Sequence, residues 1–244
     1  MEVRLESISK RYSGTWALNA VSLQFSEGEN IAVLGLNGAG KTTLLSILAG
    51  LAAPDKGTLF YDHDAFKRSR MDMRKRVFYT PDVPFYFEEK TVIENIAAFV
   101  QMYDRQASFD ASALADLMDE IELAHLGDKE VRQLSRGQKW KLALSCAAAI
   151  QPEVWLVDEP FASGMDALGL AGFKKVVGKL TQSGKTVVYT TQLMELAVSF
   201  SSRMLLLNDG VVRLYEETSK VAGLLQQNEG KVDELFRGLR SPAT

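Results

Sequence analysis

Short apolar and β-branched runs alternate with turn residues along the first 35 positions of the chain. Residues 3–8, 21–25 and 31–34 form three such runs, and each predicts a strand. Ser13 with Gly14 and the polar cluster 26–29 stand between them and predict turns. We therefore expect antiparallel strands that lead into a buried strand at residues 31–34.

Apolar runs of the same kind continue along the rest of the chain. They predict strands at residues 58–61, 77–80, 154–157, 186–191, 204–207 and 211–215. The last two flank Asn208, Asp209 and Gly210, a sequence typical of a tight hairpin turn. Residues 43–48 have a helical pattern instead, and we expect that helix to run on until Pro54 ends it.

Between about residues 83 and 150 the apolar positions change to helical spacing. Thr91 and Glu94 have the spacing of a capping box. The apolar residues behind it recur every three or four positions, at Ile93, Ile96, Ala97, Val100 and Tyr103. A second helix is marked by Leu114, Leu117, Met118 and Ile121. The pattern predicts an α/β fold with a helical block inserted between strands.

Composition and charge give no reason to expect binding to nucleic acid. The 244 residues carry a net charge of −3, and the isoelectric point is near 5.6. We therefore interpret the locally basic stretch 67–76 as a solvated helix face rather than a nucleic-acid or lipid-headgroup patch. Cys146 stands in an apolar stretch, which predicts a buried thiol in a reducing compartment.

Two further observations concern membranes. No apolar run approaches the length needed to cross a bilayer, and the first residues lack the apolar core of a signal peptide. The expected location is the cytoplasm, with any membrane role depending on a partner protein.

The most specific chemical signal is the sequence Gly-Leu-Asn-Gly-Ala-Gly-Lys-Thr from Gly35 to Thr42, placed between a predicted strand and a predicted helix. This is the pattern of a P-loop, in which backbone N–H groups and a helix N-terminus surround phosphate. We expect Lys41 to reach the β- and γ-phosphates of a nucleotide and Thr42 to bind Mg²⁺. The predicted nucleotide-binding residues are Gly35, Asn37, Gly38, Ala39, Gly40, Lys41, Thr42 and Thr43.

A second signal is the apolar run 154–157 followed by Asp158 and Glu159. A buried strand that ends there would direct Asp158 at Mg²⁺, and Glu159 would stand where attacking water could be held. Shortly before it, the sequence Leu-Ser-Arg-Gly-Gln at residues 134–138 opens a predicted helix. Its N-terminus is suited to bind an anion.

Together these sequences resemble the ATP-binding cassette (ABC) ATPases, and the resemblance runs over nearly the whole chain. It implies an α/β fold with a P-loop NTPase (RecA-like) core, an antiparallel β-subdomain and an inserted α-helical subdomain. The expected ABC ATPase domain is 1–217, with the helical subdomain at about 83–150. Residues 218–244 are expected to form a short C-terminal extension.

The resemblance also implies that two copies act together. Tyr12 matches the aromatic residue that stacks on adenine, and residues 163–166 match the D-loop, which places Asp166 near the nucleotide. Two cassettes of this family pack head to tail, so that each nucleotide lies between both chains. The residues that one chain would contribute to the site of the other are Ser135, Gly137 and Gln138.

The implied ligands are ATP and Mg²⁺. Glu159 is expected to position or deprotonate water, and Lys41 and Gln192 to contact the γ-phosphate. The predicted metal ligands are Thr42, Asp158 and Asp82.

Several positions depart from the family pattern. Asp82 stands where the Q-loop glutamine is usual, and Gln192 stands where the switch histidine is usual. Arg136 replaces the second glycine of the signature sequence, and Met165 replaces a leucine. The histidines of the chain, His63 and His125, stand elsewhere. A neutral glutamine cannot carry a proton or positive charge, so we expect slow hydrolysis.

The expected function is therefore an ATP-binding and ATP-hydrolysing subunit that powers transport through a separate membrane-spanning chain. Residues 89–95 resemble their counterparts in exporter-type systems. Residues 84–87, which include Phe85 and Tyr86, fit either a groove for the membrane partner or the core under the helical block. The expected assembly is a homodimer at the cytoplasmic face of a membrane.

Two other functions remain open. One is a soluble ABC ATPase without a transport role, although such proteins usually have paired cassettes or large insertions. The other is a slow-turnover regulatory cassette in an asymmetric heterodimer, which Asp82 and Gln192 favour. A GTPase is disfavoured because the sequence contains no base-reading Asn/Thr-Lys-x-Asp motif. The transported substrate and the direction of transport are not determined by the sequence.

Overall fold

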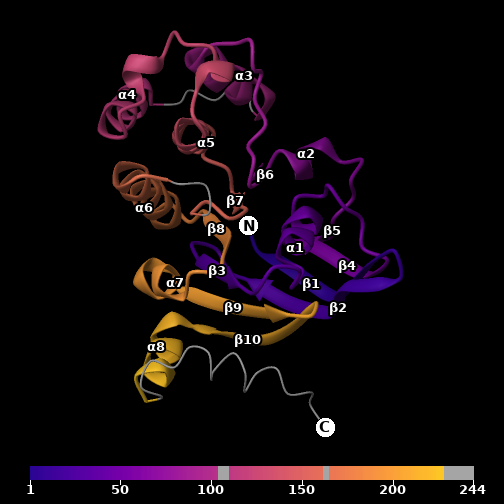
Figure 1. The fold of residues 1–244 in the computed structure, drawn as a ribbon. Helices are drawn as coiled ribbons and strands as arrows, with labels where there is room; N and C mark the ends of the chain where they lie inside the picture. Colours follow the sequence, from indigo (N-terminus) through magenta and orange to yellow (C-terminus); the bar gives the residue numbers. More distant parts are fainter. Residues whose placement is uncertain (104–109, 162–164, 228–244) are drawn as a thin grey trace.

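The structure is a computed structural model that describes residues 1–103, 110–161 and 165–227. Two sheets and a set of helices make up this part of the chain (Figure 1). The larger sheet has the strand order β10-β9-β3-β8-β7-β6 and contains β3 (Asn30–Leu34), β6 (Val77–Thr80), β7 (Val154–Val157), β8 (Thr186–Thr191), β9 (Arg203–Asn208) and β10 (Val211–Glu217). Its strands are parallel except for β10, which pairs antiparallel with β9. The predicted α/β class is confirmed.

The smaller sheet is antiparallel, with the order β2-β1-β4-β5. It contains β1 (Val3–Tyr12), β2 (Thr15–Phe25), β4 (Lys56–Tyr61) and β5 (Asp64–Ala65). The predicted turn at Ser13 and Gly14 is present, but β1 and β2 extend up to it because their polar ends pair with each other, as in Tyr12 with Thr15. The sequence predicted shorter strands because apolar alternation stops before the hydrogen-bonded ladder does.

Helix α1 (Lys41–Leu48) lies between the two sheets. Leu44 and Leu45 on this helix pack with Val3 and Leu5 of β1 and with Ile31 of β3, and all five side chains are buried. The helix ends at Leu48 and does not continue to Pro54, because the chain turns at Gly50, whose φ of +69° is typical of a residue just past a helix C-terminus.

The other face of the larger sheet is covered by α6 (Ala167–Gln182) and α7 (Met194–Phe200). Strands β3, β7 and β8 are buried on both faces, as expected for a parallel sheet between helical layers. The predicted bounds of β7 and β8 agree with the structure. Cys146 is fully buried, and burial raises the pKa of its thiol, which confirms the expectation of a core cysteine.

The inserted block contains α3 (Val92–Tyr103), α4 (Ala111–Glu120), two short 3₁₀ helices (Ala124–Leu126 and Val131–Gln133) and α5 (Arg136–Ile150). Figure 1 shows α3 and α4 at the end of the molecule away from β10, with α5 between them and the sheet. The predicted capping box is present: the Thr91 amide donates to Glu94 and the Glu94 amide donates to the Thr91 hydroxyl. Helix α5 packs against both α3 and α6, so it connects the block to the core.

Two shorter regions complete the fold. The basic stretch 67–76 forms only a four-residue helix, α2 (Met71–Arg74). Helix α8 (Thr218–Gln227) follows β10 directly, and its Val221 is fully buried in the core. The division of the chain at residue 217 stays a prediction. No helix in the described residues is both long and apolar enough to cross a membrane.

Candidate functional site

The sequence from Gly35 to Thr42 forms a loop between β3 and α1. Within it the Ala39 amide donates to the Leu36 carbonyl, and the next turn is the start of α1, where the Leu44 amide donates to Gly40. The loop is also held from outside, because the Gly210 amide in the β9–β10 hairpin donates to the Ala39 carbonyl. The P-loop is therefore a hydrogen-bonded turn that ends in a helix N-terminus, the arrangement that binds phosphate.

The glycines of this loop are required for different reasons. A Cβ on Gly35 would lie 2.5 Å from the Leu207 carbonyl oxygen, and one on Gly40 would lie 2.3 Å from the Ala17 carbonyl oxygen. These two glycines therefore let the loop pack closely on neighbouring strands. Gly38 faces open space but has a φ of +80°, which favours glycine at the tip of the turn.

Lys41 is the first residue of α1, and only 6% of its surface is exposed. Its Nζ donates to the carbonyl oxygens of Gly35 at 2.8 Å and Leu36 at 3.3 Å, and it lies 3.0 Å from Glu159 Oε1. Glu159 Oε1 is buried and accepts no well-directed hydrogen bond, so its contact with Lys41 is mainly one between charges. The structure thus brings together the predicted phosphate-binding lysine and the predicted base.

Asp158 lies at the end of β7 with only 3% of its surface exposed. Its Oδ1 accepts from the Thr190 hydroxyl at 2.6 Å, and its Oδ2 lies 3.4 Å from the Tyr79 hydroxyl. Burial, and next the nearby Asp158 charge, raise the pKa of Tyr79, so this phenol stays protonated. The Thr190 hydroxyl also accepts from the Glu159 amide at 2.8 Å, so it fixes both acids.

Thr190 and Tyr79 were not singled out by the sequence analysis. Both residues are on strands next to β7. Tyr79 of β6 pairs with Leu156 of β7, and Thr190 of β8 directly follows Tyr189, which pairs with Val157 of β7. The carboxyl ends of β6 and β8 therefore flank the Asp158 carboxylate. The polar residues near the ends of the strands predicted at 77–80 and 186–191 could have indicated Tyr79 and Thr190. That would have required knowing the order of the strands in the sheet.

Glu159 has a φ of +47°, a left-handed conformation that is uncommon for a residue with a side chain. Such strain is maintained only where surrounding contacts fix it. The hydrogen bond from its amide to Thr190 is one such contact. The effect is to hold the Glu159 carboxylate beside Lys41.

Gln192 lies just past β8 and reaches the P-loop. Its side-chain amide donates to Asn37 Oδ1 at 3.1 Å. The switch position and the tip of the P-loop are thus joined by a neutral hydrogen bond.

Tyr12 is half exposed at the end of β1, with Lys10 Nζ 5.5 Å from its ring centroid. The hairpin it belongs to approaches the P-loop, because Ala17 and Leu18 of β2 contact Gly40. This position is compatible with a base-stacking role, which stays a prediction.

Ser135, Gly137 and Gln138 lie in a different place from the P-loop. They line a shallow pocket with Lys141 and Asp166, and none of the P-loop residues lines it. The Ser135 hydroxyl accepts from the Gln138 amide and the Gln138 side chain accepts from the Ser135 amide, so both residues form the capping box of α5. Gln138 therefore has a structural task that the sequence analysis did not assign.

Asp166 is the N-cap of α6 and accepts from the Gly169 amide at 2.7 Å. Its other oxygen lies 2.8 Å from Lys141 Nζ, and the hydrogen bond from Lys141 lowers the pKa of Asp166 below its ordinary value. Within one chain Asp166 thus belongs to the Ser135 pocket. Residues 163 and 164 of the predicted D-loop lie outside the described residues.

Asp82 was expected to bind Mg²⁺, which stays a prediction, and in the structure its carboxylate contacts Arg136. Arg136 Nη2 donates to Asp82 Oδ1 at 2.7 Å. Among the residues that the structure describes, no group of three or more His, Cys, Asp and Glu side chains is arranged to hold a metal. Binding of Mg²⁺ by Asp158 and the Thr42 hydroxyl, with nucleotide oxygens and water as further ligands, stays a prediction.

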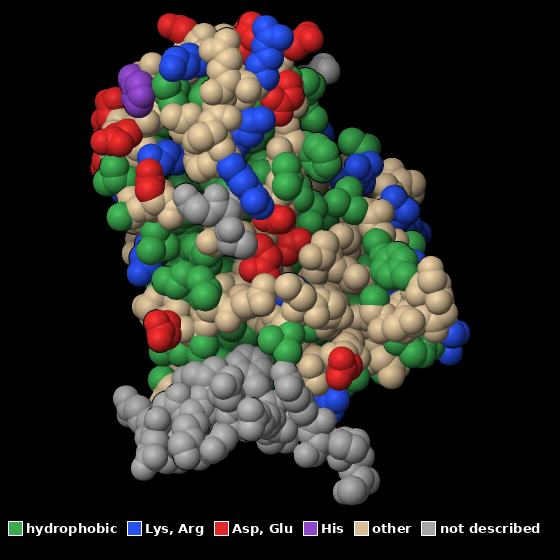
Figure 2. Space-filling model, viewed as in Figure 1, with side chains coloured by type: hydrophobic (Ala, Val, Ile, Leu, Met, Phe, Trp, Pro, Cys, Tyr) green, Lys and Arg blue, Asp and Glu red, His purple; other side chains and the backbone are tan. Residues whose placement is uncertain are grey.

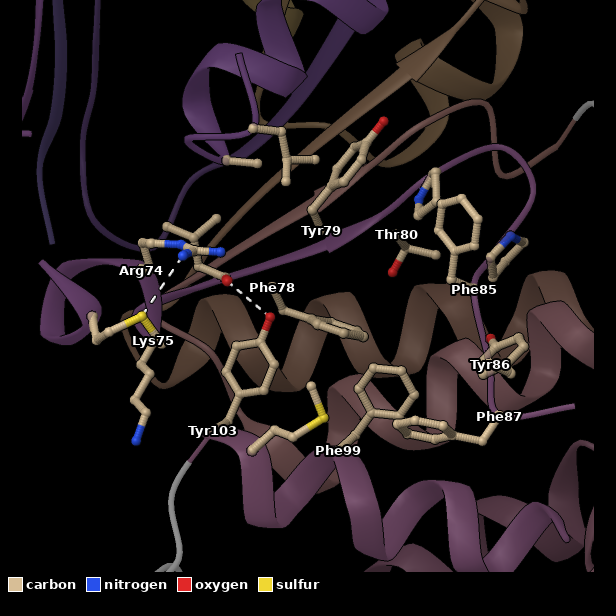
Figure 3. A pocket seen from close by; sticks show the side chains of 17 residues that line it. Arg74, Lys75, Phe78, Tyr79, Thr80, Phe85, Tyr86, Phe87, Phe99 and Tyr103 are labelled. Carbon is tan, nitrogen blue, oxygen red and sulfur yellow. Dashed lines mark hydrogen bonds between the residues drawn. The ribbon is translucent and has the colours of Figure 1, made fainter. Parts of the chain in front are cut away.

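An apolar groove of about 510 Å³ lies between α1, α2 and α3 (Figure 3). Phe85, with 82% of its surface exposed, and Phe87 line it, and Arg74 and Lys75 stand at one end. Tyr86 is packed into the core, where its hydroxyl donates to the Lys139 carbonyl at 2.7 Å and burial keeps its pKa high. Tyr86 thus fits the core interpretation of residues 84–87, whereas Phe85 lines a groove whose use by a membrane partner stays a prediction.

A P-loop at the start of a helix, beside a buried acid pair at the carboxyl ends of parallel strands, defines a P-loop nucleotide-binding protein. Comparison with known proteins narrows the class. A sequence model described as ABC transporter matches residues 18–162. The chain is 34% identical to the sulfate/thiosulfate import ATP-binding protein of Pseudomonas putida, over 87% of this chain and 65% of that protein. It is 32% identical to a putative ABC transporter ATP-binding protein of Methanocaldococcus jannaschii, over 96% of this chain and 81% of that protein.

Solved structures agree on the fold. An ATP-binding subunit of an ABC transporter superposes with a TM-score of 0.85 at 22% identity, covering 99% of this chain and all of that one. A dimeric ATP-binding cassette described as a post-hydrolysis state with ADP and Pi gives 0.78 at 25% identity, covering 88% and 98%. The chain belongs to the ABC transporter family, which confirms the resemblance and the predicted fold class. It spans only 63–66% of the length of the first three sulfate/thiosulfate relatives.

Proposed function

We propose that this chain is the ATP-binding and ATP-hydrolysing subunit of an ABC transporter. The observation that carries the proposal is the contact between Lys41 and Glu159 at the mouth of the P-loop, 3.0 Å apart. ATP hydrolysis needs a lysine that contacts the phosphates and a carboxylate that positions the attacking water, and this contact brings both groups to one place.

The residues have distinct tasks in this proposal. The loop amides and Lys41 bind the phosphates, with Lys41 exchanging its contacts to the loop carbonyls for phosphate oxygens. Asp158 and Thr42 would hold Mg²⁺, which would supply positive charge next to the phosphates. Glu159 accepts a proton from, or orients, the attacking water. Thr190 keeps both acids in place through its hydrogen bonds.

The separation of the two predicted half-sites supports a dimer. The Ser135 pocket and the P-loop share no lining residues, so the nucleotide at one P-loop needs a second chain to supply Ser135 and Gly137. We propose two copies of this chain related by two-fold symmetry, each completing the site of the other.

The apolar groove supports a protein partner. Exposed Phe85 and Phe87 form an apolar surface, and a partner helix that covered them would remove this surface from water. The basic residues Arg74 and Lys75 at its end favour an acidic residue on that partner. We propose that the partner is the membrane-spanning subunit, which would hold this chain at the cytoplasmic face.

The direction of transport is not part of the proposal. The expectation of an exporter-type system finds no support, because the similar proteins with a named substrate are import proteins for sulfate or thiosulfate. Those names describe the relatives, and the substrate of this chain's transporter depends on its membrane subunit.

A slow-turnover cassette is a second candidate, and the Gln192–Asn37 hydrogen bond favours it. A neutral amide gives a weaker contact to phosphate than a charged group does. The test for both candidates is Mg²⁺-dependent phosphate release by the purified chain with ATP. Release that Glu159→Gln abolishes supports an ATPase, binding of ATP without release supports the regulatory cassette, and no ATP binding contradicts both.

A further inference from the structure

Asp82 and Arg136 are two positions where a charged residue replaces an uncharged one of the family pattern, and they contact each other. Arg136 Nη2 and Asp82 Oδ1 are 2.7 Å apart, and each side chain is about half exposed, 50% and 47% respectively. The positions are 54 residues apart in the chain. Two departures that form one ion pair are more simply explained as one feature than as two losses.

The Asp82 end of the pair is fixed beside the nucleotide site. Asp82 follows β6 by two residues, and the last residue of β6, Thr80, accepts a hydrogen bond from the Asp158 amide at 2.9 Å. The position of Asp82 therefore depends on strand β6, which is hydrogen-bonded to the segment that carries Asp158 and Glu159.

The Arg136 end is fixed to the helix that presents Ser135. Arg136 is the first residue of α5, directly after the N-cap, and the capping box keeps this helix start rigid. Further along, Lys139 pairs with Glu88 at 2.7 Å, and the Lys139 carbonyl accepts from Tyr86. The chain from Asp82 to Glu88 therefore runs along the first turns of α5. Figure 2 shows Lys and Arg side chains running down the helical part of this face toward a group of acidic side chains.

We propose that Asp82 and Arg136 form a positioning pair that sets the orientation of α5, and hence of Ser135, relative to the nucleotide site of the same chain. The inference rests on the proposed function. In this arrangement Asp82 serves Arg136 and not Mg²⁺. Breaking the pair leaves each P-loop able to bind nucleotide but lets α5 adopt orientations in which Ser135 does not fit the second chain.

A double-mutant cycle tests the pair without adding any new charge. Asp82→Ala, Arg136→Ala and the double variant are compared with the wild type in three assays: Mg·ADP binding by the monomer, ATP-driven dimerisation in a Glu159→Gln background, and steady-state hydrolysis. We expect each single variant to lower dimerisation and turnover by about two- to fivefold, the effect of losing one exposed ion pair. The double variant is expected to be no worse than either single variant, because both break the same interaction.

Nucleotide affinity and its Mg²⁺ dependence are expected to stay unchanged in all three variants, and the melting temperature to fall by no more than about 2–4 °C, since one exposed ion pair contributes at most about 1 kcal/mol. Lys175 and Glu120 are the matched control, since they form an exposed ion pair that joins α6 to α4 and neither residue lines the Ser135 pocket. Their alanine variants should not affect dimerisation.

Three results would overturn the inference. Losses that multiply in the double variant would mean independent roles, and a raised Mg²⁺ requirement in Asp82→Ala would make Asp82 a metal ligand. Unchanged dimerisation in every variant would make the pair irrelevant. In each case normal nucleotide binding leaves the proposed function intact, whereas a wild type that does not bind ATP contradicts the proposed function and the inference with it.

Discussion

Lys41 Nζ lies 3.0 Å from Glu159 Oε1, so the lysine of the P-loop and the acid after β7 neutralise each other. The pair is mostly buried, with only 6% and 17% of the two side chains exposed. A bound phosphate and the Glu159 carboxylate would both attract the same ammonium group. Substitution of Glu159 is therefore expected to affect hydrolysis, and substitution of Lys41 to affect nucleotide binding.

Replacing Glu159 with Gln should separate binding from hydrolysis. The amide keeps the size of the side chain but cannot accept a proton, so turnover is expected to fall by roughly 10²–10⁴-fold. ATP affinity should be retained, because the substitution removes a carboxylate that competes with phosphate for Lys41 and removes no contact to phosphate. Phosphate release and equilibrium ATP binding measure the two effects. Unchanged turnover would exclude Glu159 as the base.

Replacing Lys41 with Ala should weaken nucleotide binding itself. The substitution removes the ammonium and leaves the Glu159 carboxylate, a repulsive charge, at the mouth of the P-loop. We expect at least a tenfold loss of ATP affinity, since a charge-assisted contact to phosphate is lost. Titration with ATP measures this, and Lys139→Ala, which removes a partly buried lysine paired with Glu88, is the control. An unchanged ATP affinity in Lys41→Ala would show that Lys41 does not bind phosphate.

Replacing Gln192 with His should raise the rate. The histidine can give a charge-assisted contact where the glutamine gives a neutral one, which is about half as strong. Adding Asp82→Gln restores a second family position, but it also releases Arg136, so we expect less gain from the double variant than from Gln192→His alone. Steady-state hydrolysis measures both. A His variant no faster than the wild type would show that glutamine carries no penalty here.

Phe85 and Tyr86 are neighbours with opposite expected responses to substitution. Phe85→Asp changes an exposed groove residue, so folding should be unaffected, and stimulation of ATP hydrolysis by the membrane subunit should be lost. Tyr86→Phe removes a buried hydrogen bond to Lys139, so stability should fall by about 1 kcal/mol. Thermal melting and reconstituted activity separate the two. A large loss of stability in Phe85→Asp would contradict the docking surface.

Arg76 should make stability depend on pH. Its guanidinium donates to Glu153 at 2.7 and 2.8 Å and to Asp62 at 2.6 Å. The hydrogen bond from Arg76 holds the pKa of Glu153 below its ordinary value of 4.5. A lowered pKa in the folded state stabilises the protein above the ordinary pKa, and this contribution is lost as the pH falls through the lowered value.

Arg76→Ala should therefore lower the stability at pH 7 by about 1 kcal/mol, a value that allows for solvent screening of a partly exposed group. The melting temperature should fall by about 2–4 °C. As the pH falls below the ordinary Glu153 value of 4.5, the difference between the variant and the wild type should shrink, and melting curves across this range measure it. Arg132→Ala, which removes an exposed pair with Glu130, is the control. A difference independent of pH would mean that Arg76 acts through packing alone.

The sequence by itself determined those features that depend on residues close together in the chain. The P-loop, the capping box at Thr91 and Glu94, the strands β7 and β8 and the hairpin turn at Asp209 and Gly210 all follow from local patterns. Backbone conformation and hydrogen bonding within a few residues are set by the side chains of those same residues. For that reason the positions of Lys41, Asp158 and Glu159 were predictable.

The tertiary structure alone decided which side chains meet across the chain. The pairing of Asp82 with Arg136, of Asp166 with Lys141 and of Thr190 with Asp158 each joins residues from separate elements. A strand pattern gives the direction of a side chain but not the identity of the neighbouring strand, and a helix pattern gives a buried face but not what covers it. Those facts follow from the order of strands and the packing of helices, which depend on the free energy of the whole core.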